Sequence, residues 1–302
     1  MTSVFWTTRF AAHTTPPGHP ERPERAEVFA EVAAEAQRLG VQVREPKSPT
    51  ESDFARVHAQ AYLSELSGVA GRAVMLDEDT FTSPESVEVA RLAAGAALDA
   101  AREAVAANGP TLALVRPPGH HATPTRAMGF CLYNNIAIAA AALRADGLER
   151  IAIVDIDVHH GNGTQDAFYA DPSVLFISSH QYPYWPGSGG AGETGSGAGQ
   201  GFTLNIPLAA GATDADYDRV YRQQVVPALE AFEPEAMLIS AGFDAHELDP
   251  LAGMRVTTGG FQALTTLLDD ASRRLCRHRI AWITEGGYHL AALRACLVQL
   301  LQ

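Results

Sequence analysis

Short runs of branched apolar residues alternate along the chain with longer stretches of helical periodicity, and this alternation constrains the fold more than any other feature. The runs expected to form strands are residues 111–115, 151–156, 174–178, 202–206, 236–240 and 280–284. The stretches expected to form helices lie near residues 22–38, 53–67, 84–107, 133–146, 214–231, 258–276 and 288–300. Apolar strands separated by helices predict a three-layer α/β fold, in which helices flank both faces of a mostly parallel central sheet. No repeat and no interdomain linker is visible, so we predict a single domain over residues 1–302.

The composition is ordinary for a soluble enzyme, with 46% hydrophobic and 19% charged residues. A formal net charge of −13 argues against nucleic acid as a partner, because phosphate backbones bind basic surfaces. The same charge suits a basic substrate, such as a polyamine or a lysine-rich tail. The apolar runs stop short of the roughly 20 residues of a membrane span, and the first residues lack a signal-peptide pattern. With three cysteines and no CxxC spacing, we expect a cytoplasmic protein with no membrane partner.

One low-complexity segment, PGSGGAGETGSGAGQG, occupies residues 186–201. It contains a formal GxGxxG match at Gly187, Gly189 and Gly192. A dinucleotide site requires that motif between a strand and the start of a helix, whereas a strand follows here. We therefore expect a tightly turning surface loop and not a nucleotide site.

The most unusual side chains follow directly on the predicted strands. Five such segments are RPPGHHA (116–122), DIDVHHGNG (155–163), SSH (178–180), AGFDAHELDP (241–250) and EGGY (285–288). In open α/β sheets, ligands bind at the carboxyl ends of the strands. Because five separate segments bring polar side chains to the same edge, we predict a catalytic site there.

Two carboxylates and two imidazoles lie within six residues after the second of these strands, and a packed core does not tolerate such charge unless it is paired or metal-bound. If strand alternation continues, Asp155, Asp157 and His159 point one way and His160 the other. Asp244, from another strand end, can add a third ligand to Asp157 and His159. Two carboxylates and one imidazole with an open fourth position describe a catalytic divalent site, since structural zinc sites are closed by four ligands. The alternative is that the carboxylates cap the following turn and the histidines pack.

The tandem pair His120–His121 follows a Pro-Pro-Gly turn at a strand end, where a general base would be needed. Each ring needs an orienting partner, and Asp155 and Asn162 are the available candidates. Tyr288 can donate its phenolic hydroxyl to a developing oxyanion. Taken alone, a tyrosine after EGG is more often a core residue.

Together these motifs resemble the zinc-dependent histone deacetylase family, including its class II-like, acetylpolyamine and acetoin-utilisation relatives in bacteria. The resemblance rests on HPERPER (19–25), RPPGHHA, GFCLYNN (129–135), DIDVHHGNGTQ (155–165), SAGFDAHELDPL (240–251) and EGGY, which span nearly the whole chain. It implies an arginase-like α/β fold and the hydrolysis of an acyl group from an amine. It also implies one catalytic Zn²⁺ held by Asp157, His159 and Asp244. Fe²⁺ is the alternative ion for the same site.

The catalytic residues implied by the resemblance are His120, His121, Asp155, Asn162 and Tyr288. His121 is similar to the general base and His120 to its electrostatic partner, with Asp155 behind it. Asn162 stands where many members have an aspartate behind the second histidine, so His121 has a neutral partner, as in class II-like members. Tyr288 is similar to the residue that polarises the acyl carbonyl.

The residues expected to contact substrate are Gly129, Phe130, Trp185, Asp79, Leu251 and Gly287. Gly129, Phe130 and Trp185 fall where the family lines a narrow tunnel, which suits the apolar methylene stem of a lysine or polyamine. Core packing is an equal alternative for Trp185. Asp79 resembles a carboxylate at the rim that holds the substrate backbone.

By similarity we also expect structural K⁺ ions in two groups. The first group is Asp155, Asp157, His159, Ser178 and Ser179. The second is Phe168, Asp171, Val174 and Tyr217.

The sequence leaves several functions open. Polyamine-specific relatives often carry a glutamate at the pocket mouth, where this chain has Leu251, so acyl-lysine or a small acylated amine is favoured over acetylpolyamine. A binuclear manganese ureohydrolase needs further carboxylates, and His246 stands where an aspartate would be required. A catalytically silent binder of acylated amines and a hydrolase that uses Cys131 as nucleophile also stay open. The oligomeric state is not predicted.

Overall fold

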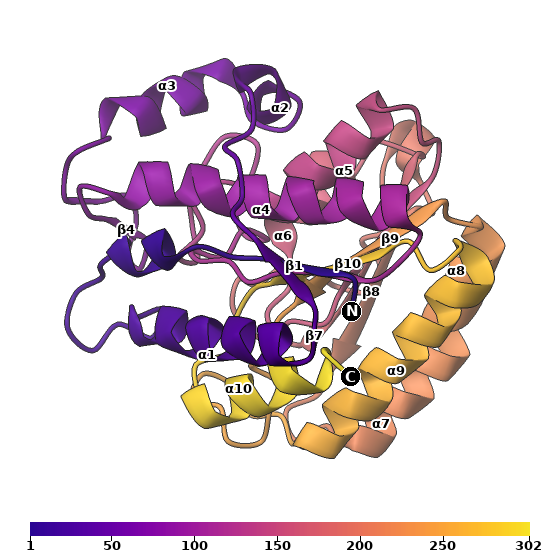
Figure 1. Ribbon diagram of the computed structural model, residues 1–302. Coiled ribbons are helices and arrows are strands. Elements are labelled where there is room, and N and C mark those ends of the chain that lie inside the picture. The colour runs from indigo at the N-terminus through magenta and orange to yellow at the C-terminus, as the bar shows by residue number, and fades with distance from the viewer.

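The structure, a computed structural model, describes residues 1–302 and is built on a sheet of eight strands, all parallel (Figure 1). Their order across the sheet is β2-β1-β5-β10-β9-β6-β7-β8. Their bounds are Ser3–Phe5 (β1), Gln42–Arg44 (β2), Thr111–Ala113 (β5), Ile151–Asp155 (β6), Val174–Gln181 (β7), Thr203–Leu208 (β8), Ala236–Ala241 (β9) and Ile280–Thr284 (β10). All six predicted strands are present. The two additional strands, β1 and β2, have three residues each, too few to show a period. A separate antiparallel pair joins β3 (Val74–Met75) to β4 (Phe81–Thr82).

Helices cover both faces of the sheet, so the predicted α/β fold is confirmed. Their bounds are Glu24–Arg38 (α1), Glu51–Ala55 (α2), Gln60–Gly68 (α3), Ser86–Ala107 (α4), Asn135–Ala145 (α5), Asn162–Phe168 (α6), Asp214–Val220 (α7), Val226–Phe232 (α8), Thr258–Leu275 (α9) and Leu290–Gln299 (α10). In Figure 1, α4 and α5 lie above the sheet, and α1, α7, α9 and α10 lie below it. Each face has its own apolar core. Alternate residues of one strand enter different cores, with Ile151 and Ile153 in one and Ala152 and Val154 in the other.

Three helical regions differ from the prediction. The expected helix at 53–67 is two helices, α2 and α3, because the chain turns between Arg56 and Ala59. The expected helix at 214–231 is interrupted by a π-helical segment, Tyr221–Val225, between α7 and α8. The short helix α6 is additional. It begins inside the polar GNG segment, where no apolar periodicity marks it.

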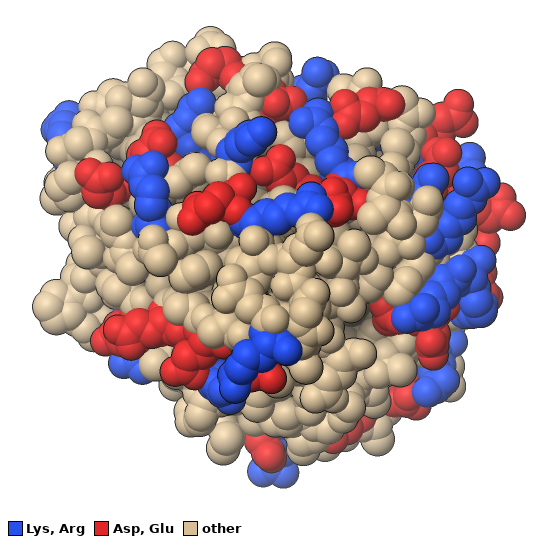
Figure 2. Space-filling model, viewed as in Figure 1, with Lys and Arg blue, Asp and Glu red and all other residues tan.

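None of the helices combines the length and the apolar character needed to cross a bilayer. On the face shown in Figure 2, acidic and basic side chains are interspersed. That face therefore carries no broad field of one sign.

The segment before α1 is anchored by a fully buried ion-pair network. Glu21 accepts from Arg116 Nε at 2.7 Å and from Arg25 Nη1 at 3.0 Å. Arg116 also donates to the backbone carbonyls of Phe10 and His13, at 2.7 and 2.8 Å. Burial alone would raise the pKa of Glu21, but the charge of Arg116 overcomes it and holds that pKa well below its usual value of 4.5. The network thus ties residues 10–25 to the turn that follows β5.

We predict that Glu21→Gln lowers the free energy of unfolding by about 3–5 kcal/mol at pH 7, because it leaves two buried guanidinium groups without their carboxylate. Since the pKa of Glu21 is lowered in the folded state, its contribution is present above about pH 4.5 and is lost as the pH falls below that value. Urea unfolding of both proteins from pH 7 to pH 3.5 measures this. Glu230→Gln, which removes an exposed partner of Arg274, is the control and should change stability by less than about 0.5 kcal/mol. An equal effect of the two substitutions would contradict the prediction.

Candidate active site

Four neighbouring strands, β5, β10, β9 and β6, deliver the candidate site residues to one edge of the sheet. In the centre of the sheet β10 pairs with β9, and β9 pairs with β6. The loops after them carry Tyr288, Asp244 and the 157–159 segment, while the turn after β5 carries His120 and His121. The structure therefore brings together the segments that the sequence placed at the strand ends.

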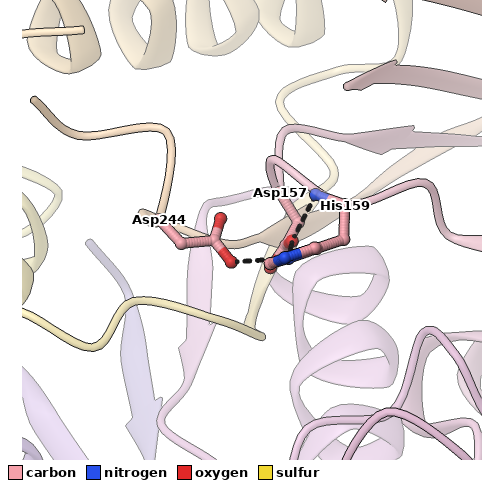
Figure 3. A group of neighbouring side chains, drawn as sticks. All are labelled: Asp157, His159 and Asp244. Carbon is pink, nitrogen blue, oxygen red and sulfur yellow. Dashed lines mark hydrogen bonds and ion pairs between the residues drawn. The ribbon is translucent and has the colours of Figure 1, made fainter. Parts of the chain in front are cut away.

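Asp157, His159 and Asp244 form a buried cluster whose ligand atoms all lie within 4.8 Å of one another. His159 Nδ1 lies 3.1 Å from Asp157 Oδ1 and 3.1 Å from Asp244 Oδ2. Figure 3 shows the three side chains pointing toward a common point, Asp244 from one loop and the other two from the loop after β6. No second group of three such side chains in the chain lies this close together.

Backbone groups hold the two carboxylates in place. Asp244 Oδ1 accepts from Val158 N at 2.8 Å, and Asp157 Oδ2 accepts from Gly286 N at 2.8 Å. The chain passes so close to these oxygens that a Cβ at Gly242 would overlap Asp157, and one at Gly286 would overlap Asp157 and Asp244. Glycine is therefore required at both positions, and the carboxylates sit in a fixed cradle.

The charges of this cluster fit a divalent cation. Burial, and then the negative charge of Asp157, raises the pKa of Asp244 to about 7. Two buried carboxylates this close need a positive charge to remain ionised together. One imidazole and two carboxylates are the donor set expected of a catalytic zinc or iron site with a free position.

The His120–His121 pair stands beside the cluster, with the rings 3.8 Å apart. His120 Nδ1 lies 2.9 Å from Asp155 Oδ2, and His121 Nδ1 lies 2.9 Å from Asn162 Oδ1. Burial alone would lower the pKa of His120, but the charges of Asp155 and nearby carboxylates raise it to about 10. Burial and the neighbouring His120 lower the pKa of His121 well below its usual value. The pair therefore combines a charged imidazole with a neutral one, whose Nδ1–H donates to the Asn162 oxygen and leaves Nε2 free to accept a proton.

Tyr288 completes the buried group, with only 7% of its surface exposed. Burial raises the pKa of its phenol well above the usual value, so the hydroxyl keeps its proton and can act as a donor. The Arg25 guanidinium lies 5.2 Å from the centre of its ring and donates to Gly287 O at 2.9 Å and to Glu285 O. The positive φ of Gly287, 122°, allows the tight turn before Tyr288.

Aromatic side chains surround the approach to this group. Trp185 is 39% exposed, so it is not a core residue, and its ring meets that of His121 edge-on at 4.6 Å. The Phe130 ring lies 5.9 Å from that of Tyr288. Gly129 lies against both of these rings, and a Cβ there would overlap them. Gly129, Phe130 and Trp185 therefore lie together at the mouth of the site.

Two further predicted contacts lie at the rim. Asp79 is half-buried beside Thr80, whose hydroxyl accepts from Phe130 N at 3.1 Å. Leu251 is partly exposed, and its carbonyl accepts from the Tyr184 hydroxyl. Their contact with a substrate stays a prediction.

The Gly-rich segment 186–201 is a loop between β7 and β8, as expected. Glu193 Oε1 accepts from Gly189 N and Gly190 N, and its Oε2 accepts from Gln165 Nε2 at 2.7 Å. His180 Nε2 lies 2.9 Å from Gly189 O, and a Cβ at Gly189 would overlap the His180 ring. The loop is thus fastened just after Trp185.

The first group expected around K⁺ is brought together, because Asp155 and Ser178 are partners in register on β6 and β7. The side chains of the second group lie apart. Phe168 and Val174 pack in the core under α4 and α5, whereas Tyr217 packs in the core on the opposite face of the sheet. The Tyr217 hydroxyl is buried there without a hydrogen-bond partner. Both K⁺ sites stay predictions that rest on the resemblance.

Two residues were missed by the sequence analysis although their motifs were recognised. Glu285 is fully buried and accepts from Gly119 N at 2.6 Å and from His120 N at 3.2 Å, so it fixes the turn that carries the histidine pair. Arg25 supports the loop of Tyr288 through the two carbonyls named above. The signal that could have identified Glu285 and Arg25 is that each is a charged residue inside one of the recognised motifs.

Comparison with known proteins decides the family. The histone deacetylase domain matches residues 19–302. The chain belongs to the histone deacetylase family. A histone deacetylase-like amidohydrolase of Pseudomonas aeruginosa is 41% identical over 92% of this chain and 75% of its own length. A probable deacetylase of Archaeoglobus fulgidus is 37% identical over 95% of the chain and 81% of its own length.

Histone deacetylase relatives from plants are longer. The chain spans 58% of histone deacetylase 10, chloroplastic, of rice (Oryza sativa subsp. japonica), at 42% identity over 80% of this chain. It spans 62% of histone deacetylase 14, chloroplastic, of Arabidopsis thaliana. Its fold matches the crystal structure of the HDA15 HD domain with a TM-score of 0.93 and 36% identity, over 99% of this chain and 88% of that one.

We predict that the purified wild-type protein retains one divalent ion per chain and that Asp244→Ala retains almost none, because an open three-ligand site cannot lose a carboxylate and still hold the ion. Elemental analysis after gel filtration measures the stoichiometry. Asp218→Asn, which removes an exposed partner of Arg222, is the control and should keep the ion. Two ions per wild-type chain would point instead to a binuclear site.

Proposed function

We propose that this chain is a metal-dependent amide hydrolase that removes an acetyl or other acyl group from an acylated amine. The observation that carries the proposal is the buried cluster of Asp157, His159 and Asp244, with His121 and Tyr288 beside it. We propose Zn²⁺ as the native ion and Fe²⁺ as the alternative. When bound, the ion would polarise the acyl oxygen and lower the pKa of a water molecule.

The residues around the cluster have complementary tasks in this reaction. His121 is neutral and takes the proton of the attacking water at Nε2, while the Asn162 oxygen holds its Nδ1–H. The charged His120, paired with Asp155, stabilises the negative charge that develops nearby. The Tyr288 hydroxyl donates to the oxygen of the tetrahedral intermediate. Together these groups supply a base, a cation and an oxyanion donor.

A thiol mechanism is disfavoured by the environment of Cys131. Burial raises the pKa of this thiol well above its usual value, and Sγ lies 3.3 Å from Gly129 O. A nucleophilic cysteine needs the opposite shift. All three cysteines are free and buried, which supports a reducing compartment such as the cytoplasm.

We predict that Tyr288→Phe lowers kcat by about 10²–10³-fold, the usual effect of removing one oxyanion donor, and leaves the metal content unchanged. Steady-state kinetics on an acetyl-lysine peptide, with elemental analysis of the same sample, measures both. Tyr182→Phe, a substitution of a partly exposed tyrosine, is the control and should change kcat by less than twofold. Near-wild-type turnover of Tyr288→Phe would contradict the role of Tyr288 as oxyanion donor.

For the substrate, we propose acyl-lysine in a peptide or protein, or a small acylated amine. At the mouth, the apolar side chains of Leu251 and the 39% exposed Trp185 lie with one rim carboxylate, Asp79, and this mainly apolar surface suits a peptide or an apolar acyl group better than a polycation. The alternative is an acetylated polyamine, which the net charge of −13 also suits. Acetyl-lysine peptides, longer acyl-lysines and acetylated polyamines should therefore be assayed side by side.

We predict that Leu251→Glu raises kcat/KM for an acetylated polyamine relative to an acetyl-lysine peptide by about fivefold. A carboxylate at the mouth would attract the distal ammonium groups of the polyamine by about 1 kcal/mol. Leu39→Glu, a substitution of an exposed leucine after α1, controls for the added net charge. An unchanged ratio at low ionic strength would show that the mouth residue does not select the substrate.

A further inference from the structure

Asp249 carries a buried carboxylate that the catalytic scheme does not use. Its surface is 7% exposed, and no arginine, lysine or histidine lies within ion-pair distance of it. Burial raises the pKa of this carboxyl group, which reflects the cost of placing it here. Such a group needs compensating donors.

Three backbone N–H groups meet this carboxylate. Its Oδ2 accepts from Tyr288 N at 2.7 Å and from His289 N at 3.1 Å, just before α10 begins. Its Oδ1 accepts from Leu251 N at 3.1 Å. One side chain therefore joins the loop of Tyr288 to the rim residue Leu251.

The loop of Tyr288 needs such an anchor. Gly286 and Gly287 precede it, and glycine does not restrict backbone direction, so local conformation alone does not fix where Tyr288 points. Arg25 holds the loop through Gly287 O and Glu285 O. Asp249 holds it through the N–H of Tyr288 itself. The rim is fastened in turn, because Leu251 O accepts from the Tyr184 hydroxyl.

We propose that Asp249 is a positioning residue, which holds the Tyr288 hydroxyl at the reacting carbonyl and fixes it relative to the mouth at Leu251. The proposal rests on the proposed function for the role of Tyr288. An asparagine at 249 offers one acceptor oxygen in place of two and turns an N–H₂ group toward backbone donors. The loop then loses at least one of its bonds, and a shift of about 1 Å in a catalytic group can cost about 10²-fold in rate.

The test is a double-mutant cycle between Asp249→Asn and Tyr288→Phe. Asp249→Asn should lower kcat by about 10–100-fold with KM changed less than threefold and metal content unchanged. In the Tyr288→Phe background it should lower kcat by less than twofold, because the hydroxyl that it positions is already absent. Equal factors in the two backgrounds would show a merely structural role and overturn the proposal.

A matched control is Asp214→Asn. Asp214 also accepts from a backbone N–H and a hydroxyl, those of Thr257 at 2.8 and 2.7 Å, but at the start of α9 and not in the loop of Tyr288. It should alter stability without a selective loss of kcat. If Asp249→Asn does not fold, Asp249→Ser, which keeps a smaller acceptor, takes its place in the cycle.

A second readout separates this proposal from the proposed function. With 3-fluorotyrosine at position 288, the ¹⁹F resonance should shift or broaden in Asp249→Asn and stay unchanged in Asp214→Asn, whether or not the protein turns over the substrates tested. If the wild-type protein is inactive on all substrates but the resonance still moves in Asp249→Asn, the positioning role stands and the proposed function is rejected. An unmoved resonance with unchanged kcat would reject the positioning role and keep the function.

Discussion

Negative charge buried at the carboxyl edge of a parallel sheet is the constraint on which the rest of this structure depends. Asp155, Asp157, Asp244 and Glu285 are all inaccessible and lie around the ends of three adjacent strands. Three kinds of interaction compensate these charges. Asp155 has a charged imidazole, Glu285 has two backbone N–H groups, and Asp157 and Asp244 share His159 in a geometry that suits a divalent ion. The paired strands hold these four carboxylates at fixed positions relative to one another.

Buried charges of the N-terminal segment are compensated in the same way, by ion pairs. Glu21 neutralises Arg116 and Arg25, and Arg25 in turn supports the loop of Tyr288. A charge network far from the candidate metal cluster in sequence therefore supports the loop of Tyr288, the residue proposed to donate to the substrate. One arginine therefore connects the buried ion-pair network of residues 19–25 with the loop that carries Tyr288.

Most of the fold and the centre of the site could be predicted from the sequence. The strands that build the site are apolar throughout, and polar residues mark their ends, so β6, β9 and β10 and the group of Asp157, His159 and Asp244 were identifiable. The short strands β1 and β2 were not, because three residues show no period. Tyr217, on α7, packs on the face of the sheet opposite to Phe168, on α6, and the side on which each helix packs is known only once the chain is folded. Glu285 was overlooked because only coordinates show which carboxylate in a motif turns inward.

The position of β10 in the sheet has a consequence for how the protein is made. This strand is the last of the eight to leave the ribosome, yet it lies between β5 and β9 in the middle of the sheet. Until residues 280–284 are available, β5 and β9 each lack the neighbour that pairs with them at this position, and unpaired strand edges are open to pairing with other chains. The nascent chain cannot assemble its catalytic centre before this strand has been made. The three candidate metal ligands lie after β6 and β9, in one half of the sheet, whereas Tyr288 follows β10, so these parts of the site meet only when the sheet closes.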